Sequence, residues 1–248
     1  MAKVEPASAL RQNCRAYHPR GPDLIELKDV TCGYGDRALL SGVNLSLQPG
    51  SFHFLTGPSG AGKTTLLRLC YADLLPVSGS VKVLGHETSR ATRDELAAMR
   101  RRIGVVHQDC QFLDHLPVDA NIALPLVVAE LDAGAKATDV GELIDWVGLG
   151  AQAKALPPSL SGGERQRAAL ARAIISSPDV LIADEPTGNL DWDMSLRLLR
   201  LLAELNRLGT AILIATHDLN LIRAAKAEVQ ARILRIRGGQ IELAGADL

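Results

Sequence analysis

The stretch of sequence that decides the fold is a glycine-rich octet: Gly57, Pro58, Ser59, Gly60, Ala61, Gly62, Lys63 and Thr64. It fits G-x-x-x-x-G-K-[ST] between a predicted strand and a predicted helix, in which Leu66, Leu67 and Cys70 recur at helical spacing. Glycines let the backbone curl so that its N–H groups point at phosphate oxygens, and the helix N-terminus adds its dipole. The Lys63 ammonium can reach the β- and γ-phosphates, and the Thr64 hydroxyl can ligate Mg²⁺. Because a chain of this length matches the pattern by chance only about 1% of the time, we predict phosphate binding.

Downstream of the octet, an apolar run, residues 180–183, ends in the acidic pair Asp184 and Glu185. Such a run suits a strand buried on both faces, and ligands bind at the carboxyl ends of strands in open α/β sheets. We expect Asp184 to hold Mg²⁺ and Glu185 to orient and deprotonate an attacking water. The alternative is an acidic pair that merely stabilises a helix dipole.

A second potential anion site lies between these two motifs, in the sequence LSGGERQR at residues 160–167. Ser161, Gly162 and Gly163 open a predicted helix, so a hydroxyl, free backbone N–H groups and a helix dipole coincide there. A simpler interpretation is a helix N-cap with a glycine-rich lead-in. A single nucleotide does not need two anion sites, so the second becomes intelligible if two chains share each nucleotide.

The order of predicted elements indicates an α/β fold. Residues 23–35 and 43–57 alternate as strands with one covered face, whereas residues 179–186 and 210–218 suit strands buried on both faces. We predict a P-loop NTPase core with a mostly parallel sheet, an N-terminal antiparallel β subdomain and an inserted helical subdomain at about 109–175. The expected domains are a flexible extension at 1–23 and one ATPase domain at 24–248.

Composition excludes several classes of protein. The 248 residues include 27 Lys and Arg against 28 Asp and Glu, a net charge of -1, which gives no support to a nucleic-acid binder. No apolar run approaches the roughly 20 residues that span a bilayer, and the N-terminus has no apolar core of a secretory signal. The four cysteines show no metal-ligand spacing: Cys14, Cys32, Cys70 and Cys110.

The phosphate loop, LSGGERQR, LIADEP and ATHD, in that order, resemble the nucleotide-binding subunits of ABC transporters from Leu24 to Leu243. The resemblance implies a head-to-tail homodimer that sandwiches two ATP molecules, each between one chain's phosphate loop and the other's Ser161. It makes Gln108 the sensor of Mg²⁺ and of the γ-phosphate, and His217 the switch histidine. The implied metal ligands are Thr64, Gln108 and Asp184, and the implied catalytic residues are Lys63, Gln108, Glu185 and His217. The implied nucleotide contacts are Tyr34 on adenine, residues Gly57, Pro58, Ser59, Gly60, Ala61, Gly62, Lys63, Thr64 and Thr65, then Ser161, Gly162, Gly163 and the coupling residue Asp191.

Within that family, the longer strings around these motifs look most like the FtsE family of cell-division ATPases. This resemblance implies an FtsX-like integral membrane subunit, regulation of peptidoglycan hydrolysis, and a place at the cytoplasmic face of the inner membrane. His107 departs from the family, which commonly has an aromatic residue before the glutamine. The alternatives are a lipoprotein-releasing or macrolide exporter ATPase and, from another class, a soluble ABC ATPase acting on DNA or ribosomes.

Overall fold

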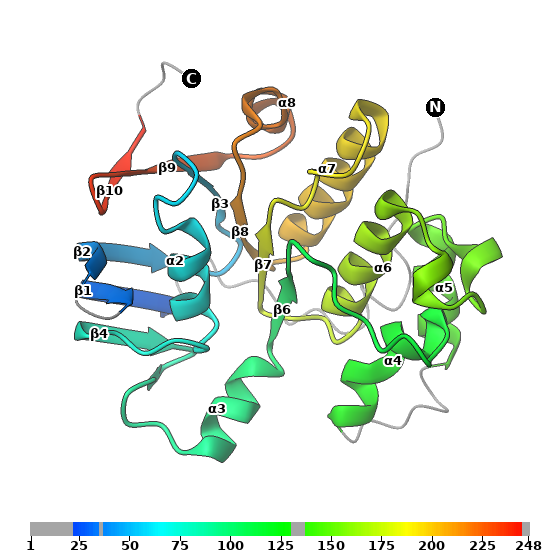
Figure 1. Ribbon diagram of the computed structural model, residues 1–248, viewed down its shortest axis with the longest axis horizontal. Helices are drawn as coiled ribbons and strands as arrows, with labels where there is room; N and C mark the ends of the chain where they lie inside the picture. Colours follow the sequence, from blue (N-terminus) through cyan, green and yellow to red (C-terminus); the bar gives the residue numbers. More distant parts are fainter. Residues whose placement is uncertain (1–21, 35–36, 130–136, 245–248) are drawn as a thin grey trace.

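The computed structural model describes residues 22–34, 37–129 and 137–244, which form two sheets with helices between and beside them (Figure 1). The extension expected at 1–23 therefore lies almost entirely outside the described residues. The larger sheet has the strand order β10-β9-β3-β8-β7-β6. All its strands run parallel except β10, which returns from β9 as an antiparallel hairpin. Its strands are β3 (Phe52–Thr56), β6 (Ile103–Val106), β7 (Val180–Asp184), β8 (Ala211–Ala215), β9 (Ala231–Arg237) and β10 (Gln240–Leu243).

The smaller sheet is antiparallel, as the sequence predicts for the N-terminal region. Its order is β2-β1-β4-β5, with Leu27 of β1 facing Leu45 of β2 on one side and Val81 of β4 on the other. The strands are β1 (Ile25–Tyr34), β2 (Arg37–Leu47), β4 (Ser78–Val83) and β5 (His86–Glu87). The predicted strand at 52–56 is present as β3, but the expectation that only one of its faces is covered is wrong. Every residue of β3 is buried, because it lies inside the parallel sheet with layers on both faces.

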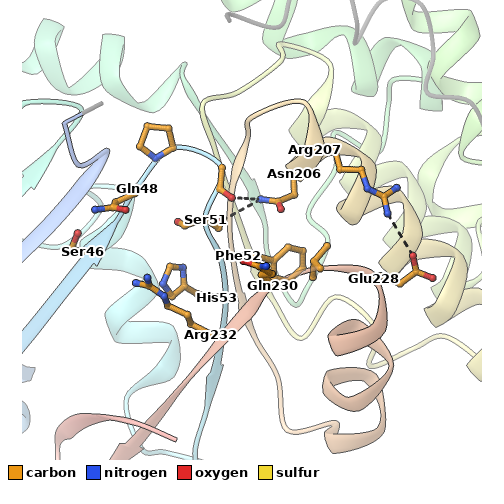
Figure 2. Close-up of a pocket in the computed structure, with 13 residues that line it drawn as sticks. Ser46, Gln48, Ser51, Phe52, His53, Asn206, Arg207, Glu228, Gln230 and Arg232 are labelled. Carbon is orange, nitrogen blue, oxygen red and sulfur yellow. Dashed lines mark hydrogen bonds and ion pairs between the residues drawn. The ribbon is translucent and has the colours of Figure 1, made fainter. Parts of the chain in front are cut away.

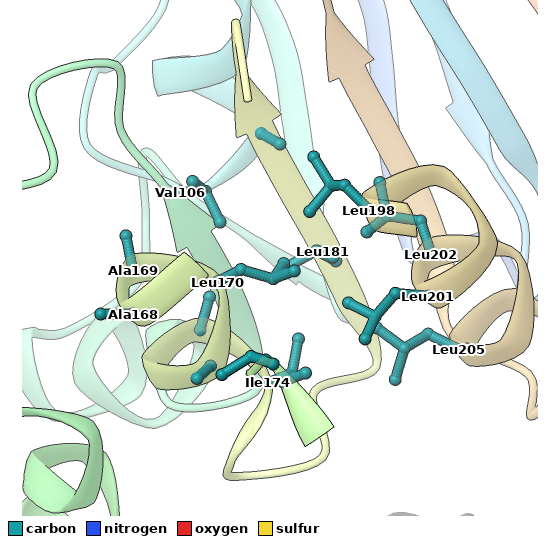
Figure 3. Packing of buried hydrophobic residues seen from close by; sticks show 14 of the residues in the cluster. Val106, Ala168, Ala169, Leu170, Ile174, Leu181, Leu198, Leu201, Leu202 and Leu205 are labelled. Atoms are coloured by element: carbon teal, nitrogen blue, oxygen red, sulfur yellow. The ribbon is translucent and has the colours of Figure 1, made fainter. Parts of the chain in front are cut away.

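Helices cover the parallel sheet on both faces. On one face α2 (Lys63–Cys70) fills the space toward the antiparallel sheet, where Leu66 and Leu69 are fully buried. The other face carries α6 (Gly162–Ile174), α7 (Trp192–Arg207) and α8 (Leu219–Glu228). Figure 3 shows Leu170 of α6 and Leu198 of α7 converging on Leu181 of β7. Burial of these side chains, each stabilising by roughly 1.5–3 kcal/mol, fixes both helices against the sheet.

A mainly helical segment connects β6 to β7, in the region where the sequence analysis places a helical subdomain. It consists of α4 (Val118–Val128), α5 (Ala137–Trp146), two short 3-10 turns (Gly150–Gln152 and Pro157–Ser159) and α6. The predicted apolar face of α5 is buried, with Leu143 only 1% exposed. The last helix of the segment, α6, packs tightly on the sheet, since a Cβ on Gly104 of β6 would lie 2.2 Å from the carbonyl oxygen of Ala173 in α6. The segment is preceded by α3 (Arg93–Arg100), which begins with a capping box at Thr92.

The parallel sheet brings distant parts of the chain to one edge. Strands β3, β8, β7 and β6 are neighbours in that order and all point the same way. Their carboxyl ends lead into the phosphate loop, His217, Asp184 and Gln108, respectively. This is the edge at which open α/β folds bind ligands.

Candidate nucleotide-binding site

The phosphate loop joins β3 to α2 and takes a conformation that requires glycine. Gly62 is the N-cap of α2 with φ 103°, a left-handed value that residues with a Cβ rarely adopt. No side chain caps this helix, so its first N–H groups stay available to an anion. The Lys63 Nζ atom donates to the carbonyl oxygens of Gly57, at 2.9 Å, and Pro58, at 3.2 Å. The ammonium therefore lies directly over the loop predicted to hold phosphates.

The two predicted metal ligands from distant parts of the chain are in contact. The Thr64 hydroxyl donates to the Asp184 carboxylate with an Oγ1–Oδ2 distance of 2.6 Å. Asp184 is only 7% exposed, and this burial raises the pKa of its carboxyl, while the Thr64 hydrogen bond opposes the shift. A hydroxyl beside one carboxylate fits Mg²⁺, which typically takes one or two carboxylates and completes its shell with phosphates and water. Among the described residues no three His, Cys, Asp or Glu side chains are grouped as metal ligands, so phosphate oxygens would have to contribute.

The next residue, Glu185, is held in place by its backbone and by a histidine. Its N–H donates to the Ala215 carbonyl of β8 at 2.9 Å, and its φ of 47° is left-handed, a strained state common at functional sites. The Oε1 atom lies 2.8 Å from His217 Nδ1. The Glu185 side chain is 14% exposed and that of His217 is 78% exposed. The predicted base and the predicted switch histidine thus form one hydrogen-bonded pair, with the other imidazole nitrogen free of it.

Gln108 is exposed just beyond β6, on a loop tied to α6 by contacts that the sequence analysis missed. The Cys110 thiol donates to Gln166 Oε1 at 2.9 Å, and the Arg165 guanidinium donates to the Cys110 carbonyl oxygen at 3.4 Å. The ring of Phe112 lies 4.7 Å from the guanidinium of Arg172. Spacing along the chain gave no signal for these ties, because they join residues more than 50 positions apart.

His107, the departure from the family pattern, packs its ring edge-on against Tyr71, with ring centroids 5.8 Å apart. The His107 imidazole therefore makes an aromatic contact that joins the loop carrying Gln108 to Tyr71 at the end of α2.

The second potential anion site is a complete helix cap. Ser161 is the N-cap of α6, and Glu164 accepts hydrogen bonds from the Ser161 hydroxyl at 2.7 Å and N–H at 2.8 Å. The simpler interpretation of this turn is therefore realised, and it leaves the exposed N-terminus of α6 available to a further partner. The two glycines serve packing as well. A Cβ on Gly162 would lie 3.4 Å from Asn189, and one on Gly163 would lie 3.1 Å from Leu190.

Asp191 has a structural role that the sequence analysis did not assign. Its carboxylate accepts from the Met194 N–H at 2.8 Å and caps α7. The sequence carries a signal for this cap, because Asp191 stands three residues before Met194, the first residue of the predicted apolar stripe of that helix.

The structure brings together one group of predicted residues and leaves another apart. Lys63, Thr64, Asp184, Glu185 and His217 share one edge of the sheet, and Gln108 follows the next strand. Figure 1 shows α6, which Ser161 caps, separated from α2 by strands β7 and β6. The side chain of Tyr34, at the end of β1, lies outside the described residues.

Comparison with known proteins identifies the class of protein that this fold and site define. A family model described as ABC transporter matches residues 40–188, which include the phosphate loop, Ser161 and the acidic pair. The chain belongs to the ABC transporter family and is an ATP-binding, ATP-hydrolysing cassette.

Individual relatives narrow the match to cell-division proteins. The chain is 44% identical over 202 residues to the cell division ATP-binding protein FtsE of Haemophilus influenzae, covering 81% of this chain and 93% of that protein. It is 40% identical over 219 residues to FtsE of Streptococcus pneumoniae, covering 88% and 94%. Relatives from two such different bacteria carry the same name.

Solved structures show the same fold. The dimeric structure of MJ0796, a bacterial ABC transporter cassette, superposes with a TM-score of 0.81 at 33% identity, covering 88% of this chain and 96% of that one. A dimeric post-hydrolysis state of MJ0796 bound to ADP and Pi gives 0.80 at 31% identity, covering 89% and 99%. The predicted fold class, an α/β NTPase core with an antiparallel β subdomain and a helical insertion, is confirmed.

Proposed function

We propose that the chain is the ATP-hydrolysing subunit of a cell-division complex whose membrane subunit is FtsX-like and which regulates peptidoglycan hydrolysis. The proposal that the chain hydrolyses ATP rests on the Glu185–His217 pair, whose Oε1 and Nδ1 atoms are 2.8 Å apart. The adjacent Asp184 accepts from the Thr64 hydroxyl at 2.6 Å. The FtsE relatives support the cell-division part.

The roles of the site residues follow from this arrangement. Lys63 and the N–H groups at the start of α2 bind the β- and γ-phosphates. Thr64 and Asp184, with Gln108, hold Mg²⁺, which when bound neutralises phosphate charge. Glu185 accepts the proton of the attacking water. His217 holds the Glu185 carboxylate through Nδ1 and leaves Nε2 to the γ-phosphate.

A second copy of the chain completes each site. The Ser161 hydroxyl at the N-terminus of α6 is engaged in a capping box, yet this end of the helix presents the exposed Gly162, the partly buried Gly163 and the positive end of a 13-residue helix. It lies apart from the phosphate loop of the same chain (Figure 1). A head-to-tail dimer resolves this separation, since Ser161, Gly162 and Gly163 then face the γ-phosphate held by the partner's loop.

The membrane subunit docks beside Gln108. Among the described residues no helix has both the length and the apolar character to cross a bilayer, and attachment through a partner is the proposed route to the membrane. A hollow of about 230 Å³ lies between the end of α2, the end of α3 and β6, and includes Tyr71, Arg100 and His107. On the loop after Gln108, Leu113 is 44% exposed, whereas Phe112 is half-buried beside two arginines. Leu113 is therefore the apolar group of this loop best placed for a partner.

Co-purification from native membranes tests the proposal. The wild-type chain is expected to bring down one integral membrane protein, identified by mass spectrometry. Leu113→Asp is expected to release the chain from the membrane fraction without loss of ATP binding. Leu243→Asp, at a leucine that is 73% exposed on β10, serves as the matched control and stays with the membrane. Recovery of an exporter subunit, or release by both variants, contradicts the proposal.

A further inference from the structure

Gln108 lies beside the predicted metal ligand Asp184, but its own side chain does not hold it there. Val106, the last residue of β6, pairs with Ala183 of β7, so the chain leaves the sheet next to Asp184. The Gln108 side chain is exposed, and among the described residues it has no hydrogen-bond partner. The direction of its amide therefore depends on the backbone that carries it.

Cys110 closes the backbone turn in which Gln108 stands. The Cys110 N–H donates to the His107 carbonyl oxygen at 3.2 Å, which makes residues 107–110 a turn with Gln108 at its second position. The Cys110 sulfur lies 3.5 Å from the same carbonyl oxygen, which belongs to the peptide bond that leads into Gln108. Cys110 has a left-handed φ of 42°, which a residue with a Cβ keeps only where its surroundings hold it.

The surroundings that hold Cys110 belong to α6. The Cys110 sulfur lies 2.9 Å from Gln166 Oε1, and the Arg165 guanidinium donates to the Cys110 carbonyl oxygen at 3.4 Å. Cys110 is 4% exposed and Gln166 is 1% exposed, so water does not compete for the contact between them. The Gln166 side chain has no other partner among the described residues. The sulfur atom thus joins the turn that carries Gln108 to a helix packed on the parallel sheet.

We propose that Cys110 is a positioning residue for ATP hydrolysis, whose thiol holds the turn against Gln166 and thereby orients the Gln108 amide toward the metal site. The inference rests on the proposed role of Gln108 as a metal ligand. Removal of a group that orients a metal ligand typically costs about 10- to 100-fold in metal affinity. Because the thiol acts only through Gln108, its loss changes the requirement for metal and leaves the binding of metal-free nucleotide as it is.

Two measurements on Cys110→Ala test the proposal. One is the Mg²⁺ concentration that gives half-maximal turnover at saturating ATP. The other does not depend on turnover: it is the affinity for Mn²⁺ of the chain loaded with a non-hydrolysable ATP analogue, followed by electron paramagnetic resonance. Both are expected to worsen about tenfold or more, while the metal-free analogue binds as tightly as to the wild type. Cys110→Ser keeps a hydrogen-bond donor and is expected to stay closer to the wild type than to Cys110→Ala.

Two further variants show whether the thiol acts through Gln166 and Gln108. Gln166→Met removes the acceptor on α6 without changing the turn, and its metal requirement is expected to match that of Cys110→Ala. Gln108→Ala removes the proposed ligand itself. Adding Cys110→Ala to Gln108→Ala is expected to cause no further loss of metal affinity, because both substitutions act on the same amide.

Asn206 provides a matched control at the other end of β3 from the phosphate loop, and Figure 2 shows it beside Ser51. Its Nδ2 atom donates to the carbonyl oxygens of Gly50, at 3.0 Å, and Ser51, at 3.4 Å, and so joins α7 to the chain that enters β3. Asn206→Ala cuts this contact between a helix and the sheet without touching Gln108. Both Asn206→Ala and Cys110→Ala are expected to lower the melting temperature, but only Cys110→Ala is expected to raise the metal requirement.

The outcomes separate this inference from the role of Gln108. A wild-type metal requirement in Cys110→Ala or Gln166→Met, beside a raised one in Gln108→Ala, overturns the inference alone. An equal rise in Asn206→Ala, or a further full loss in the double variant, also overturns it. A wild-type requirement in Gln108→Ala overturns the role of Gln108 as a metal ligand and this inference with it.

Discussion

Replacing Glu185 by glutamine, His217 by alanine, and then both together tests the hydrogen-bonded pair at the end of β7. The Glu185 carboxylate is held by the 2.8 Å contact with His217 Nδ1, and the Glu185 backbone is held by its N–H, which donates to the Ala215 carbonyl. Glutamine keeps the size of the side chain and can still accept from the imidazole, but it cannot take a proton from water. The substitution therefore removes the proposed base with little change in shape.

The expected magnitudes follow from these contacts. Loss of a general base typically lowers the rate about 10²- to 10⁴-fold. Loss of a hydrogen bond to a charged group costs about 1.5–3 kcal/mol, so we expect His217→Ala to lower turnover roughly tenfold to a hundredfold. Because His217 acts partly by holding Glu185, the two losses overlap. We expect the double variant to be far less impaired than the product of the single losses implies.

Phosphate release at saturating MgATP measures the three rates, and equilibrium binding of a fluorescent ATP analogue checks that affinity is retained. His115→Ala, at an exposed histidine outside the site, is the control and should keep wild-type turnover. Strictly multiplicative losses would refute coupling through the hydrogen bond. A Glu185→Gln variant that keeps more than about a tenth of wild-type turnover would refute the assignment of the base.

Three other substitutions probe the metal site, the core and the adenine contact. Asp184→Asn removes a carboxylate whose pKa is raised by burial above its ordinary value of 3.8, so ionisation of Asp184 destabilises the nucleotide-free fold as the pH rises. The melting temperature of the variant, relative to that of the wild type, should therefore increase from acid to neutral pH, and the opposite trend would contradict this. Gly104→Ala should lower the free energy of unfolding by about 1–3 kcal/mol in urea titrations, because its Cβ would lie 2.2 Å from the Ala173 carbonyl oxygen; Gly141→Ala, with open space around it, should hold or gain up to about 1 kcal/mol, and equal effects would refute the packing argument. Tyr34→Ala should weaken ATP binding about tenfold or more through loss of stacking, and an unchanged dissociation constant would exclude that role.

Much of the site could be predicted because its signals are local. The phosphate loop needs glycines and a lysine at fixed spacing, and the acidic pair follows an apolar run that suits a strand buried on both faces. Parallel strands then bring Thr64 and Asp184 together although 120 residues separate them. Once the strand direction is given, no further information is needed to place both side chains at one edge.

What could not be predicted depends on tertiary packing. The burial of β3 on both faces depends on the position of that strand inside the sheet, which alternation of residues does not encode. The hydrogen bond between Cys110 and Gln166 joins residues 56 positions apart. It forms only when α6 is packed beside the loop that follows β6.

The most direct test of the central claim is the mass of Glu185→Gln in solution, measured by light scattering during gel filtration with MgATP. If two chains share each ATP, the variant binds nucleotide without turning it over and elutes at about twice the 26.5 kDa of the single chain. With MgADP, which lacks the γ-phosphate that the N-terminus of α6 is proposed to bind, it elutes as a monomer. A variant that binds ATP yet remains a monomer would contradict the claim.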